Sequence, residues 1–66
     1  MTDGEIIRKE RLRLQESQRI FAMRMRLTAC FLQAIEMDHV KISDGLKLQL
    51  ASTLNKTVGE LFHSDK

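Results

Sequence analysis

The chain has 66 residues and a net charge of +2, with three glycines, one cysteine and no proline. This length allows one domain at most, with a small core and modest stability. No apolar run approaches the roughly 20 residues of a membrane span and no signal peptide is recognisable, so we expect a single cytoplasmic domain over 1–66.

The first two helices are predicted over 4–14 and from 18 to about 25. Thr2 or Asp3 can cap the first and Ser17 the second, because their side-chain oxygens accept hydrogen bonds from backbone amides at a helix start. The apolar residues of the first helix form no single stripe. The second helix places three apolar residues on one face: Phe21, Ala22 and Met25.

Three further helices are predicted in the second half of the chain, and the caps expected for them are Thr28, Ser43 and Thr57. The third helix runs to about 37, the fourth covers 44–54 and the fifth covers about 58–62. A polar tail follows at 63–66. Their inward residues are Leu32, Ile35, Leu46, Leu50, Ala51, Leu54, Val58, Leu61 and Phe62. No glycine or proline marks the breaks near 16 and 27, so one long helical hairpin is the alternative fold.

The stretches SQRIFAMRMRLTACFLQAIE and SDGLKLQLASTLNKTVGELF together resemble the Cro and phage-repressor type of helix-turn-helix domain, the xenobiotic-response-element family. The resemblance covers 7–62. The residues that carry it are Ser17, Gln18, Phe21, Ala22, Ile35, Glu36, Ala51, Leu54, Leu61 and Phe62. It implies an all-α fold, a compact five-helix domain with a helix-turn-helix.

The resemblance also implies an ion pair between Arg11 and Glu36, which makes Glu36 a structural residue rather than a catalytic one. Arg26 and Asp38 stand where the family has glycines, and a left-handed backbone at Arg26 would carry strain. Two acidic residues occupy positions where the family buries leucine in and after the first helix: Glu10 and Glu16.

By the same resemblance, the third helix would lie in the major groove of double-stranded DNA. The expected DNA-binding residues are Gln18, Arg24, Thr28, Ala29, Cys30, Gln33 and Lys41. Only Gln33 can offer paired hydrogen bonds to a base, so DNA shape would supply much of the specificity. Residues 1–26 carry a charge of +3, which suits phosphate or an acidic partner. We therefore expect a small transcriptional regulator, a homodimeric repressor of the phage or mobile-element type.

The alternative is a domain of the same shape that binds a protein, as an antiactivator or anti-repressor does. The third helix and its neighbours carry an apolar set that could dock a regulatory partner, with methionines adapting the fit. These residues are Met23, Ala29, Cys30, Phe31, Ala34 and Met37.

The sequence offers little support for an enzymatic or metal-binding function. His39 and His63 are far apart, Cys30 has no second cysteine, and no glycine-rich phosphate cradle is present. Cys30, Asp38 and His39 are close in sequence, but so small a domain offers no evident pocket. We predict no catalytic activity, no cofactor, no metal and no small-molecule substrate.

Overall fold

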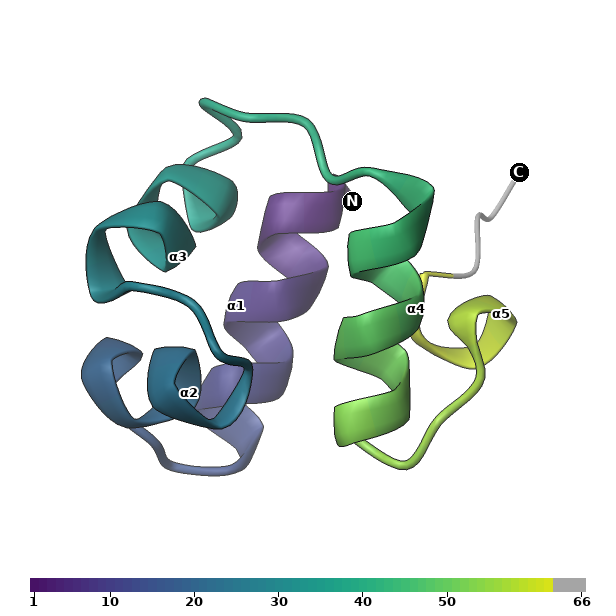
Figure 1. The fold of residues 1–66 in the computed structure, drawn as a ribbon, viewed down its shortest axis with the longest axis horizontal. Coiled ribbons are helices and arrows are strands. Elements are labelled where there is room, and N and C mark those ends of the chain that lie inside the picture. The colour runs from purple at the N-terminus through teal and green to yellow at the C-terminus, as the bar shows by residue number, and fades with distance from the viewer. Residues whose placement is uncertain (63–66) are drawn as a thin grey trace.

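The computed structural model describes residues 1–62, and the helices in that range are α1 (Asp3–Arg13), α2 (Gln18–Arg24), α3 (Ala29–Glu36), α4 (Asp44–Thr53) and α5 (Val58–Leu61). In Figure 1, α1 lies between α2 and α3 on one side and α4 and α5 on the other. The predicted all-α, compact five-helix fold is confirmed, and the helical hairpin is wrong. The polar tail predicted at 63–66, with His63, lies outside the described residues.

Every one of these helices begins after a serine or threonine whose hydroxyl accepts a hydrogen bond from the backbone N–H three residues later. The caps are Thr2, Ser17, Thr28, Ser43 and Thr57. In α1 and α5, a glutamate side chain returns a hydrogen bond to the cap's own N–H and closes a capping box. The breaks between helices therefore arise from local side-chain chemistry, as the sequence predicted for the caps.

Two residues after the end of each of the first four helices, the backbone is left-handed, at φ values of 58° to 63°: Gln15, Arg26, Asp38 and Asn55. The residue after each one donates its N–H to a carbonyl five positions back, as Leu27 does to Ala22 at 2.8 Å. This pattern is the Schellman motif, which usually places glycine at the left-handed position. A left-handed conformation costs a non-glycine residue about 1–2 kcal/mol, so the strain expected at Arg26 is present.

The core is made mainly by α2, α3 and α4. Its largest fully buried side chains are Ile7, Phe21, Met25, Leu32, Ile35 and Leu50. Leu46, Leu54, Val58 and Phe62 are half-buried against this core. In α1 only Gly4 and Ile7 are buried, which agrees with the absence of a clear apolar stripe there.

The start of α1 packs directly against the end of α3. A Cβ atom on Gly4 would lie 2.3 Å from the carbonyl oxygen of Ile35 and 2.7 Å from Asp38 Oδ1. Asp38 Oδ2 accepts a hydrogen bond from the hydroxyl of Thr2 at 2.8 Å, and its Oδ1 accepts one from the N–H of Gly4 at 3.2 Å. The carboxylate of Asp38 therefore holds the N-terminus of α1.

Glu10 connects α1 to the turn before α5. Its carboxylate lies 2.7 Å from Arg13 Nη2 and 2.8 Å from Lys56 Nζ. Burial disfavours the charged carboxylate, but the hydrogen bonds from Arg13 and Lys56 outweigh that cost and lower the pKa of Glu10. Glu10 thus links two helical segments through ion pairs.

We predict that Gly4→Ala destabilises the domain by about 1–3 kcal/mol, because a methyl group there meets backbone oxygens that cannot move independently. The matched control is Gly45→Ala in α4, where no atom lies within 4 Å of the added Cβ. That control should gain about 0.5–1 kcal/mol, since alanine favours a helix over glycine. Urea unfolding followed by circular dichroism measures both. Equal stability of the two variants would mean that the contact between α1 and α3 is looser than described.

Candidate nucleic-acid interface

A buried ion pair joins α1 to α3. Arg11 Nε lies 2.7 Å from Glu36 Oε2, and Arg11 Nη2 lies 3.1 Å from Glu36 Oε1. The Arg11 side chain is 12% exposed and that of Glu36 only 3%. The two parallel hydrogen bonds fix the end of α3 against the last turn of α1, and the pair that the resemblance implied is confirmed.

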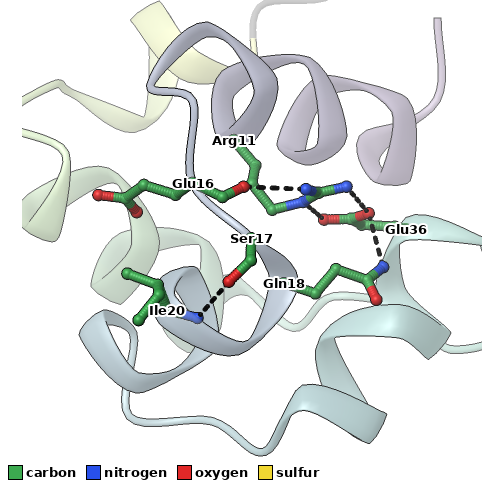
Figure 2. A network of polar contacts seen from close by, with 6 residues as sticks. All are labelled: Arg11, Glu16, Ser17, Gln18, Ile20 and Glu36. Atoms are coloured by element: carbon green, nitrogen blue, oxygen red, sulfur yellow. Dashed lines mark hydrogen bonds and ion pairs between the residues drawn. The ribbon is translucent and has the colours of Figure 1, made fainter.

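Gln18, the first residue of α2, belongs to the same network. Its Nε2 donates to Glu36 Oε1 at 3.1 Å, and Figure 2 shows its amide reaching the carboxylate beside the arginine. Arg11 Nη1 also donates to the backbone carbonyl of Glu16 at 3.0 Å. One carboxylate and one guanidinium therefore set the positions of α1, the turn before α2, the start of α2 and the end of α3.

The residues of α3 predicted to face the groove are not part of this network. Ala29, Cys30 and Gln33 are exposed, while Ala34 is half-buried. Thr28 caps the helix, and its hydroxyl accepts the N–H of Phe31 at 3.0 Å. The residues predicted to face the groove thus lie together on one helix, and Gln33 is the one among them that can pair its amide with a base edge.

The predicted phosphate contacts are more scattered. The amide of Gln18 is half-buried and engaged with Glu36, and the guanidinium of Arg24 pairs with Glu16. Lys41 is exposed in the connection that leaves α3 and crosses over the N-terminal end of α1 toward α4 (Figure 1). The pairing of Arg24 with Glu16 could not be predicted from the sequence, because it joins α2 to the preceding turn.

Four large apolar side chains are exposed on α2, on α3 and at the residue that ends α3. Met23 is 66% exposed, Met37 55% and Phe31 39%. Ile20, which the sequence reasoning did not single out, is 49% exposed. It precedes Met23 by three positions on α2, so the spacing alone could have placed both side chains on one face. We call these four residues the apolar surface.

Several other features of the described chain bear on the predicted function. Within residues 1–62, no three His, Cys, Asp or Glu side chains gather in a way that could hold a metal ion. None of the helices in this range has the length and apolarity needed to cross a membrane. Family models, curated proteins and solved structures offer no match to this chain.

We predict that Glu36→Ala lowers the free energy of unfolding by about 3–5 kcal/mol, because it leaves the Arg11 guanidinium without its buried partner. The matched control is Glu16→Ala, which breaks the more exposed pair with Arg24 and should cost no more than about 1 kcal/mol. Thermal unfolding followed by circular dichroism compares the two. If Glu36→Leu with Arg11→Met restores stability while Glu36→Ala alone loses it, the cost comes from the unpaired charge. Similar small losses in both single variants would contradict this account.

Proposed function

We propose that this protein is a small transcriptional regulator that binds double-stranded DNA through α3 and acts as a repressor. The observation that carries the proposal is the network on Glu36. It fixes α2 and α3 against α1 from the inner side, so that the outward side of α3 is rigidly held and available for binding. A helix that reads a groove must be held in this way, because base contacts depend on its register on the duplex.

In this proposal α3 enters the major groove, and Gln33 donates to and accepts from one adenine edge. Ala29 and Cys30 supply close apolar contact near the helix start. Backbone amides at that start, Thr28 and Lys41 position the duplex through its phosphates. With one amide side chain for direct readout, the shape of the duplex carries much of the specificity.

The proposal includes a homodimer, in which two copies of α3 would lie about 34 Å apart, one turn of DNA. By the resemblance to the Cro and phage-repressor type, Val58, Leu61 and Phe62 near the C-terminus are the candidates for this contact. Leu61 is 4% exposed and belongs to the monomer core. Val58 and Phe62 are half-buried and keep surface for a second subunit. The ring of Phe62 also lies beneath Lys47 Nζ, which is 5.4 Å from its centroid.

Fluorescence anisotropy with the duplex upstream of the protein's own gene tests the proposal. We expect binding that weakens steeply with salt and is tighter than binding to a scrambled duplex. Gln33→Ala should lower the preference for the native duplex by about tenfold, because it removes the paired hydrogen bonds to one base. Ser52→Ala, on the exposed side of α4, is the control and should bind like the wild type. A wild-type protein that binds both duplexes equally and weakly would rule out the proposal.

A second candidate function is supported by the apolar surface of Ile20, Met23, Phe31 and Met37. Protein interfaces are enriched in methionine and aromatic residues, whereas a DNA interface is rich in positive charge. An antiactivator or anti-repressor would use this surface, together with Cys30 and Ala34 of α3, to cover part of another regulator. It would need the same rigid scaffold but no contact with DNA. Neither function includes a catalytic step.

Phe31→Ser distinguishes the two functions. The ring is 39% exposed, so its removal should leave the fold and DNA binding largely intact but abolish co-purification of a regulator from cell extract. Leu48→Ser is the matched control, since Leu48 is 62% exposed on α4, outside the apolar surface. Loss of co-purification in both variants would argue against a specific surface. Unfolding of Phe31→Ser would show that the ring is part of the core.

A further inference from the structure

Arg26 occupies a backbone conformation that arginine does not favour. It stands in the turn between α2 and α3 with φ of 63°. In residues 1–62, the other non-glycine residues with a left-handed backbone are Gln15, Asp38 and Asn55. Asparagine and aspartate adopt this conformation more readily, and Asp38 also uses its carboxylate to hold α1. Gln15 and Arg26 have no such advantage, and only Arg26 carries a charge. Glycine at 26 would form the same turn without the strain.

The charge of Arg26 is not neutralised by the part of the chain that the structure describes. Arg24, two residues earlier, pairs with Glu16, and Glu36 is engaged with Arg11. Arg26 is exposed and forms no ion pair with a carboxylate in residues 1–62. It lies two positions before Thr28, the cap of α3, and the unpaired amides at that helix start add a positive partial charge nearby.

We propose that Arg26 binds a phosphate of the DNA backbone beside the point where α3 enters the major groove. This inference rests on the proposed function. Strained residues that persist where an unstrained one would serve are characteristic of functional sites. A guanidinium is well suited to a phosphate, because its donors match two oxygens at once. Arg26 could therefore bind a phosphate directly, whereas Arg24 could do so only by breaking its ion pair with Glu16.

The experiment measures anisotropy of a fluorescent duplex from upstream of the gene, over a series of salt concentrations, with the full chain and three variants. Arg26→Gly removes the charge and the strain together, Arg26→Lys keeps the charge, and Asn55→Gly changes a left-handed helix end between α4 and α5. Figure 1 places that turn across α1 from α2 and α3. Thermal unfolding of each variant is recorded alongside.

We expect Arg26→Gly to melt about 4 °C or more above the wild type, because the strain is relieved. It should nevertheless bind the duplex about tenfold more weakly, and the slope of log affinity against log salt should become shallower by about 0.9, the value for one phosphate. Arg26→Lys should keep the wild-type slope. Asn55→Gly should bind like the wild type, because it changes a left-handed residue in another turn without removing a charge.

Several outcomes would overturn the inference. Wild-type affinity in Arg26→Gly would remove Arg26 from the interface while the proposed function stands, and weaker binding with an unchanged slope would exclude a phosphate contact. An equal loss in Asn55→Gly would show that the effect is not local to the turn. If the wild-type protein itself shows no salt-dependent binding, the proposed function fails and this inference fails with it. An acidic protein surface would then be the ligand to test against Arg26.

Discussion

The arrangement of the first three helices depends on the carboxylate of Glu36. A charge so deeply buried is costly unless partners satisfy it, and here Arg11 and Gln18 together occupy both of its oxygens. Because Arg11 also donates to the carbonyl of Glu16, the same network positions the turn that leads into α2. The pair contributes less through net energy than through geometry, since other placements of α1, α2 and α3 would leave a buried charge without partners.

Around this network, the chain makes its turns without glycine or proline. Hydroxyl caps start the helices, and residues in the left-handed conformation end α1 to α4. Part of the conformational cost is offset elsewhere: Asp38 is strained at the end of α3, yet its carboxylate accepts hydrogen bonds from Thr2 and Gly4 at the start of α1. The close approach of these two helix ends in turn requires a residue without a side chain at position 4. Local strain and tertiary packing are thus linked at this point.

The two candidate functions use the same rigid scaffold but different chemistry on its surface. α3 presents small and apolar side chains outward, with Gln33 as its one amide, whereas DNA readers commonly place several hydrogen-bonding side chains there. The apolar surface includes Ile20 and Met23 of α2 as well as residues of α3 and its end. Positive charges are also exposed in this part of the chain, at Arg19 on α2, at Arg26 in the turn and at Lys41 after α3. A DNA complex would draw on those charges, and a protein complex on the apolar side chains.

The sequence by itself determined where helices begin and which of their residues face inward, because caps and apolar spacing act within a few positions. Ser17 with Phe21, Ala22 and Met25, and Thr28 with Leu32 and Ile35, were predictable on that basis. The ion pair of Arg11 with Glu36 could be anticipated only from a resemblance. Tertiary structure decided that Gln18 shares Glu36, that Asp38 hydrogen-bonds Thr2, 36 positions earlier, and that Glu10 meets Lys56, 46 positions away. Spacing along one helix says which residues share a face, but only the packing of helices says which charge that face will meet.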